Sequence, residues 1–111
     1  MDYPDFMRGF PSLDIPYPEE VVSTNVIRSD AGLVVFFTVH QDVEIPEHSH
    51  GHQWGALFAG QIKLTVDGQT RNCKAGDTWD IPAGTLHSAT LFAGSRLMDV
   101  FAEPNRYPIK S

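Results

Sequence analysis

Cysteine is almost absent from this chain of 111 residues. Cys73 is the only one, which excludes an intramolecular disulfide and any zinc or iron–sulfur site built from several cysteines. A chain of this length can bury one hydrophobic core without disulfide bonds, but it is too short to form two cores. We therefore expect one domain in a reducing compartment, and we predict the cytoplasm.

Basic residues are few, and long hydrophobic runs are missing. The chain has eight basic and 14 acidic residues, for a formal net charge of -6. This composition does not favour binding to nucleic acid or anionic lipid. The longest apolar stretch, residues 33–39, is far too short to span a membrane, and the N-terminus lacks the order of a secretion signal. The sequence predicts a soluble protein whose partner is a small molecule, with no nucleic acid and no membrane.

Proline is concentrated at the N-terminus, with four of the eight prolines in the first 18 residues. Because proline removes amide donors and disfavours helix, residues 1–20 are predicted to form an extended arm ahead of a domain over residues 21–111. The arm also carries aromatic and aliphatic residues, so it could pack on its own domain or on a second subunit. A homodimer is the oligomeric state we predict.

A helical period is lacking throughout, and short runs of β-favouring residues alternate with turn residues instead. Asp67-Gly68 between two such runs predicts a tight hairpin, because that pair readily adopts positive φ. Eight to ten strands at this spacing predict an all-β sandwich or barrel. The runs cover residues 21–28, 33–40, 43–46, 53–60, 61–66, 69–74, 78–81, 87–92 and 96–101.

Histidine is the residue type that indicates chemistry. His48 and His50 are two apart, so on a strand they point to one face and can bind the same ion. His87, far along the chain, is the predicted third ligand. Neutral imidazole binds divalent transition metals, and we predict one such ion among nickel, zinc, iron, manganese and cobalt.

On these histidines and the glycines and prolines around them, the chain resembles the cupin superfamily over roughly residues 34–102. Its second motif, G-x5-P-x-G-x2-H, is matched in full by Gly76, Pro82, Gly84 and His87. Its first motif is matched by His48, His50 and Gly60. The resemblance implies a double-sheet jelly-roll β-barrel.

The first motif departs from the family pattern at two positions. Asp42 replaces the leading glycine, and Gln53 stands in the register of the glutamate. The resemblance implies Gln53 as the fourth ligand, although strand alternation allows this only if the chain bulges, for which Gly51 is the natural place. His52 keeps the parity of the other histidines and is the alternative fourth ligand.

The C-terminal run is similar to that of small cupins that ketonise unsaturated uronates. This resemblance implies catalytic roles for Asp99 and Arg106 and a pocket role for Phe101. Strand parity also sends Asp99 inward, where a buried carboxylate needs a partner or a role in proton transfer. The alternative is an ion pair of Asp99 with Arg96 or Arg71.

Two tryptophans are predicted to border the ligand. Trp54 is next to Gln53, and Trp79 lies in the strand before the His87 turn. We expect a metal-dependent enzyme acting on a small polar metabolite such as a sugar acid, of the isomerase or tautomerase type. A non-catalytic binding or sensing module and a non-haem metal dioxygenase are the alternatives.

Overall fold

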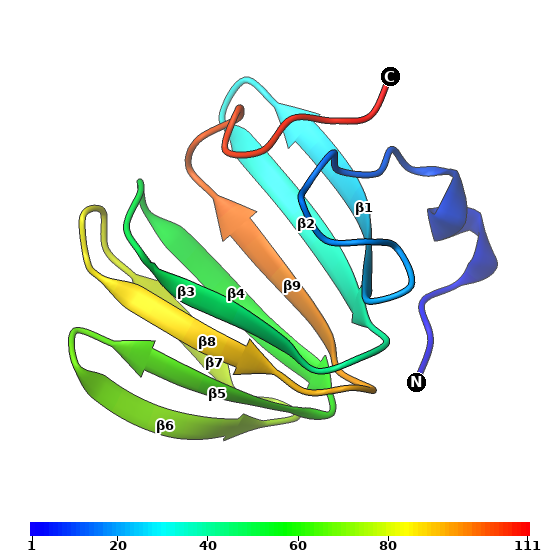
Figure 1. Ribbon diagram of the computed structural model, residues 1–111. Coiled ribbons are helices and arrows are strands. Elements are labelled where there is room, and N and C mark those ends of the chain that lie inside the picture. Colours follow the sequence, from blue (N-terminus) through cyan, green and yellow to red (C-terminus); the bar gives the residue numbers. More distant parts are fainter.

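The computed structural model describes residues 1–111 and consists almost entirely of β-strands (Figure 1). The only helical element is η1, a short 3-10 helix in the N-terminal arm (Asp5–Gly9). It lacks the length and apolar character needed to cross a membrane. The strands are β1 (Val22–Ser29), β2 (Gly32–Val39), β3 (Val43–His48), β4 (Gln53–Ala59), β5 (Gln61–Val66), β6 (Gln69–Lys74), β7 (Thr78–Ile81), β8 (His87–Leu91) and β9 (Arg96–Phe101).

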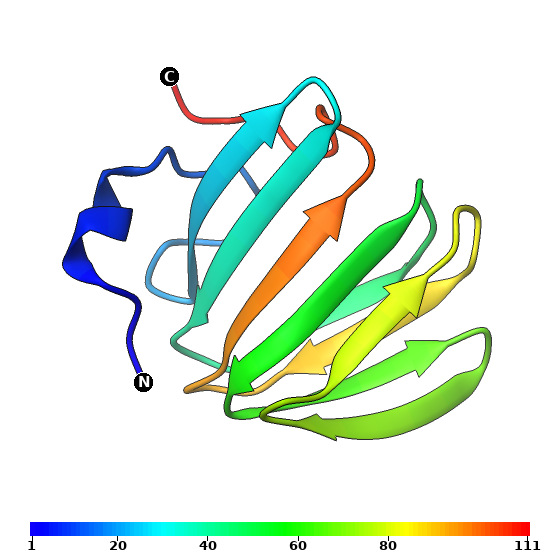
Figure 2. The same ribbon diagram turned by 180° about the vertical axis from the view of Figure 1, so that it is seen from behind.

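The strands form two antiparallel sheets that face each other. One has five strands in the order β1-β2-β9-β4-β7, and the other has four in the order β3-β8-β5-β6. Figure 2 shows the outer face of the five-stranded sheet, with β9 between β2 and β4. The predicted double-sheet β-barrel is confirmed, and every predicted run has a matching strand.

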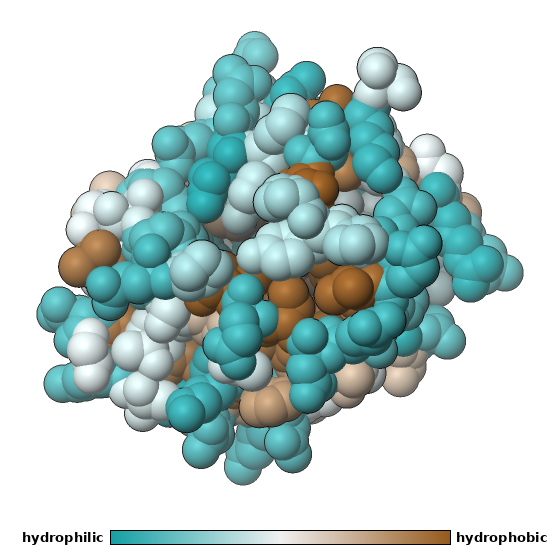
Figure 3. Space-filling model, viewed as in Figure 1, coloured by the Kyte–Doolittle hydropathy of each residue, from teal (hydrophilic) through white to brown (hydrophobic).

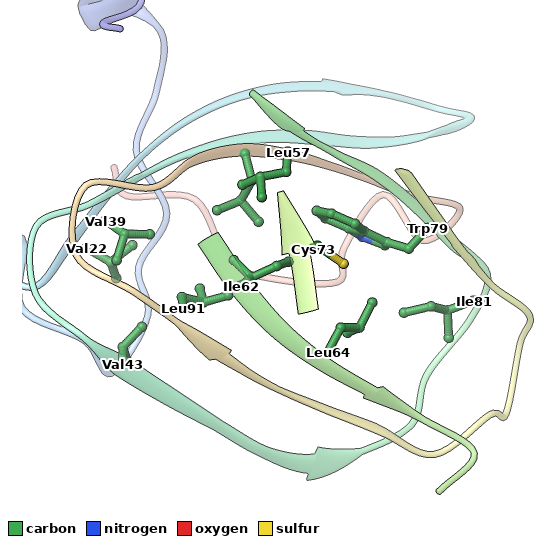
Figure 4. Packing of buried hydrophobic residues seen from close by; sticks show 11 residues of the cluster. Val22, Val39, Val43, Leu57, Ile62, Leu64, Cys73, Trp79, Ile81 and Leu91 are labelled. Carbon is green, nitrogen blue, oxygen red and sulfur yellow. The ribbon is translucent and has the colours of Figure 1, made fainter. Parts of the chain in front are cut away.

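Turn chemistry closes the hairpin between β5 and β6 as predicted. Asp67 has φ 50° and Gly68 has φ 77°, the two successive positive values of a type I′ turn. The register then runs without a shift from Val66 opposite Gln69 to Gln61 opposite Lys74. A hydrophobic core fills the space between the sheets (Figure 4), and it includes the inward residues Leu57, Ile62 and Trp79.

The N-terminal arm lies across its own barrel in this chain. Leu13 is buried and bridges Ile109 of the C-terminal segment, and Lys110 forms an ion pair with Glu19 at 2.8 Å. The Tyr3 hydroxyl donates to the carbonyls of Phe37 (2.9 Å) and Leu97 (3.1 Å). The arm and the C-terminal segment together therefore cover one side of the barrel.

Candidate metal centre and cavity

Three histidines converge at one end of the barrel. His48 ends β3 and lies opposite His87, the first residue of β8, while His50 belongs to the connection that follows β3. The ring nitrogens that these three residues offer lie within 4.8 Å of one another. The predicted histidine set is thus brought together from two adjacent strands and one loop.

Each of these rings is held by a bond to a neighbouring backbone carbonyl. The Nδ1 atoms of His48, His50 and His87 donate at 2.8, 2.9 and 2.9 Å to the carbonyls of Pro46, Gly51 and Thr85, respectively. A carbonyl can only accept, so Nδ1 carries the proton and the Nε2 lone pair is left free. Three Nε2 atoms are therefore prepared as ligands by their own local backbone.

Burial favours the neutral form of two of these imidazoles. It lowers the pKa of His50 and of His87, and the charge of Arg106 lowers both further, although each ring's bond to a carbonyl acts in the opposite direction. Neutral imidazole is the form that binds metal, because protonation would occupy the lone pair.

Gln53 supplies an oxygen to the same end of the cavity. It is the first residue of β4, it points inward, and it is buried. The bulge that we expected at Gly51 is absent. The chain leaves the sheet after His48 and enters the other sheet at Gln53, which resets the strand parity.

Three buried atoms at this end have no hydrogen-bond partner: His50 Nε2, His87 Nε2 and Gln53 Oε1. All three are acceptors, and leaving a buried acceptor unpaired costs about 1–3 kcal/mol. A set of two or three imidazole nitrogens and one amide oxygen fits a divalent transition metal ion. The residues present therefore fit the ion that the sequence predicts.

Two residues considered at the sequence level lie elsewhere. His52 is exposed and pairs with Asp80 on the outer side of the sheet, so it is separated from the three converging histidines. Trp54 is 41% exposed and lines a shallow groove on the outer face, so its predicted place in the ligand pocket is wrong. The cause is strand alternation, since Trp54 has the opposite parity to the inward Gln53.

Asp99 lies buried on β9 and faces the cavity. Trp79 Nε1 donates a hydrogen bond to Asp99 Oδ1 at 2.9 Å. The alternative ion pair with Arg96 or Arg71 does not form. Arg96 pairs with Asp2 at 3.0 Å, and Arg71 donates to the carbonyl of Thr78. Burial raises the pKa of Asp99 to about 6, against hydrogen bonds from Gln53 and Trp79 that lower it. Trp79 and Gln53 are therefore the two side chains that donate to this carboxylate, with Trp79 at 2.9 Å.

A cavity of about 270 Å³ opens beside these residues, and 14 of its 22 lining residues are hydrophobic. On the face shown in Figure 3, hydrophobic side chains show through between hydrophilic ones. Trp79, Phe101 and Arg106 line the cavity, as do Ile15 to Tyr17 of the arm. No local sequence pattern indicates that the arm forms a wall of the cavity, because contacts between distant segments leave no such pattern.

Comparison with known proteins gives a family and a set of folds. The family model described as a cupin domain matches residues 35–96, more than half of the chain, whereas no curated protein sequence was found that matches it.

Three solved structures illustrate the likeness of fold. An RmlC-like cupin from Shewanella frigidimarina is 23% identical, with a TM-score of 0.75, 96% of this chain covered and 94% of the other. KdgF from Halomonas sp. is 20% identical, with a TM-score of 0.74 and coverages of 89% and 90%. An oxalate decarboxylase variant from Bacillus subtilis is 16% identical, with a TM-score of 0.72, and the match covers 89% of this chain but 29% of that one.

Proposed function

Because the chain belongs to the cupin family, we propose that it is a metal-dependent enzyme that isomerises a small carbonyl compound. His48, His50 and His87 bind one divalent transition metal ion, and Gln53 is the fourth ligand. The observation that carries the proposal is the set of buried acceptors without partners, His50 Nε2, His87 Nε2 and Gln53 Oε1, beside a cavity that a carboxylate also faces. Nickel, zinc, iron, manganese and cobalt all suit these ligands.

The role of each group in this reaction follows from its chemistry. A bound divalent ion supplies Lewis-acid polarisation of a substrate carbonyl. Asp99 takes a proton from the carbon next to that carbonyl and returns it at another atom, so that substrate and product are isomers and no co-reactant is consumed. Trp79 keeps the Asp99 carboxylate in place through its 2.9 Å bond, and Arg106 holds an anionic group of the substrate. Tautomerisation of a sugar acid, which the resemblance of the C-terminal run implies, is one reaction of this type, and tautomerisation of a keto acid with an apolar body is another.

Metal analysis of the purified protein by plasma mass spectrometry tests the metal site. We expect about one equivalent of a transition metal in the wild type and in His52→Ala, which alters an exposed histidine outside the cluster. The double variant His48→Ala/His87→Ala is expected to lose the ion. Wild-type protein that holds no more metal than the double variant, even after incubation with each ion, would sink the proposal.

Turnover without oxygen separates the three functions. An isomerase converts a carbonyl substrate anaerobically and with no change in mass, and Asp99→Asn is expected to abolish the reaction while metal is retained. A non-haem dioxygenase stops when oxygen is removed. A binding or sensing module binds the compound and forms no product.

We also propose a homodimer that forms through the outer face of the five-stranded sheet. Ile27, Trp54 and Phe58 on this face are 48%, 41% and 38% exposed. An ordinary interface covers about 800 Å² per partner, roughly an eighth of the 6266 Å² surface of this chain. Sedimentation velocity is expected to show a dimer that Trp54→Glu converts to a monomer, and a monomeric wild type would refute it.

A further inference from the structure

We infer that the substrate of this site is a small carboxylate with an apolar body, rather than a polyhydroxylated sugar acid. The inference rests on the proposed function, because it names the substrate class of the same cavity. Three features carry it: the size of the cavity, the distribution of polar groups along it, and an arginine on its wall that lacks an anionic partner.

The cavity admits only a small ligand. Its volume of about 270 Å³ is at the lower end of ligand pockets, which start near about 300 Å³. A single ring or a short branched chain with a carboxylate fits this volume, whereas an oligosaccharide does not.

Strand register shows that the polar groups lie at one end. In the four-stranded sheet, His87 lies opposite His48 and Val66 at this end, and the next inward position of β8 is Ala89, opposite Ile45 and Leu64. One step further, Leu91 lies opposite Val43 and Ile62. Apart from Ser88 of β8, the residues of these strands that line the cavity beyond the histidines are therefore hydrophobic.

The five-stranded sheet repeats this order. Gln53 lies opposite Phe101, then Gly55 opposite Asp99, then Leu57 opposite Leu97, which also lies opposite Phe37. Beyond Asp99 this wall is also hydrocarbon. Hydroxyl groups along the body of a sugar would lose their water there and find no partners, whereas an apolar body would gain from burial.

Arg106 provides the site for one negative charge. Its guanidinium lies 4.3 Å from the centre of the Tyr107 ring and 5.8 Å from that of Phe101. Its Nε is buried without a hydrogen-bond partner, and no carboxylate of the chain forms an ion pair with it. Because arginine binds carboxylates through a fork of donors, a substrate carboxylate is the anion it fits.

Calorimetry with three acids tests the substrate class directly. Phenylpyruvate has an apolar ring and an enolisable carbonyl, pyruvate has the same polar head without the ring, and D-galacturonate carries hydroxyls along its body. Metal-loaded wild type is expected to bind phenylpyruvate at least tenfold more tightly than either of the others. Equal or tighter binding of galacturonate would overturn the inference.

Two variants test which part of the cavity binds the carboxylate of the ligand and which part binds its apolar ring. Arg106→Gln is expected to weaken phenylpyruvate at least tenfold, whereas Arg8→Gln, in the exposed part of the arm, leaves it unchanged. Ala89→Leu fills the space beyond His87 and is expected to weaken phenylpyruvate at least tenfold while pyruvate changes less than twofold. Equal losses of both acids in Ala89→Leu, with an unchanged melting temperature, would contradict the assignment of the apolar wall.

The same titrations on metal-free protein separate this inference from the proposed function. If wild type binds no metal but still prefers phenylpyruvate to galacturonate, the substrate class holds and the metal-dependent reaction is wrong. If metal binds and galacturonate is preferred, the reverse is true.

Discussion

Gly55 lies directly beside the hydrogen bond between Trp79 and Asp99. A Cβ atom at this position would lie 2.1 Å from Trp79 Nε1 and 2.4 Å from Asp99 Oδ1, so the pair exists only because residue 55 has no side chain. Both partners are buried, and neither can move without disturbing the core.

We predict that Gly55→Ala costs about 1–3 kcal/mol of unfolding free energy, the usual cost of overpacking, and lowers turnover through displacement of Asp99. Urea denaturation and a rate assay check this. Gly9→Ala is the matched control, since its Cβ would meet nothing within 4 Å. A Gly55→Ala variant with wild-type stability and rate would show that the pair tolerates displacement.

Gln53 combines an amide with a position next to a buried carboxylate. Its side chain hydrogen-bonds to Asp99 while its Oε1 stays unpaired. A glutamate would match the family pattern but would set a second carboxylate beside Asp99. The amide thus avoids a like-charge pair in the interior, which accounts for the departure from the motif.

We predict that Gln53→Glu destabilises the metal-free protein by about 1–3 kcal/mol, because an amide donor is replaced by a group that must repel Asp99 or be protonated. Adding zinc or nickel should raise the melting temperature of the variant more than that of the wild type, since the ion offsets the added charge. Thermal melts of both proteins with and without metal measure this. An equal metal-induced shift in the two proteins would argue against Gln53 as a ligand.

At the scale of elements, the N-terminal arm is fixed to the barrel partly by a tyrosine hydroxyl. Tyr3 bonds to one carbonyl of β2 and one of β9, and its ring packs on Phe36 and Phe58. Burial raises the pKa of Tyr3 far above its usual range, although nearby Arg96 acts against this. The hydroxyl must stay protonated to donate.

We predict a pH-dependent loss of stability on the alkaline side. The unfolded chain releases the tyrosine proton above about pH 10, whereas the folded chain retains it, so the free energy of unfolding is unaffected below that pH and falls above it. Tyr3→Phe should lose about 1 kcal/mol at neutral pH and show a shallower alkaline decline. Urea denaturation from pH 8 to 11 tests both effects, and parallel curves for the two proteins would refute the role of Tyr3.

Sequence patterns predicted the strands because alternation and turn chemistry are local. The strand over residues 61–66, before Asp67-Gly68, could be predicted without tertiary information. The second motif likewise identified His87 from the sequence alone. Gln53 was harder, because its direction depends on where the chain changes sheet, and alternation carried across residues 49–52 gave the wrong parity. The arm as a cavity wall and Gly55 as the space for Trp79 both depend on packing between distant segments, which no local pattern reports.

At the scale of the whole molecule, the proposed ligands come from both sheets. His48 and His87 belong to the four-stranded sheet and Gln53 to the five-stranded one, with His50 on the connection between them. Away from this end, a continuous hydrophobic cluster joins the sheets, whereas here they meet through polar atoms without partners. An ion bound at this end therefore links the sheets where hydrophobic packing is weakest.

We predict that metal stabilises the fold and that the effect is concentrated at this end. At a free metal concentration 100-fold above the dissociation constant, the free energy of unfolding should rise by about 2.7 kcal/mol. Amide hydrogen exchange should slow around His48 to Gln53 and around His87, and change little in the hairpin of β5 and β6 near Asp67. His50→Ala should remove both effects and His52→Ala neither, because of these two residues only His50 offers a buried nitrogen to the ion. Uniform protection across the barrel would mean that the ion acts on the global unfolding equilibrium alone and does not link the two sheets locally.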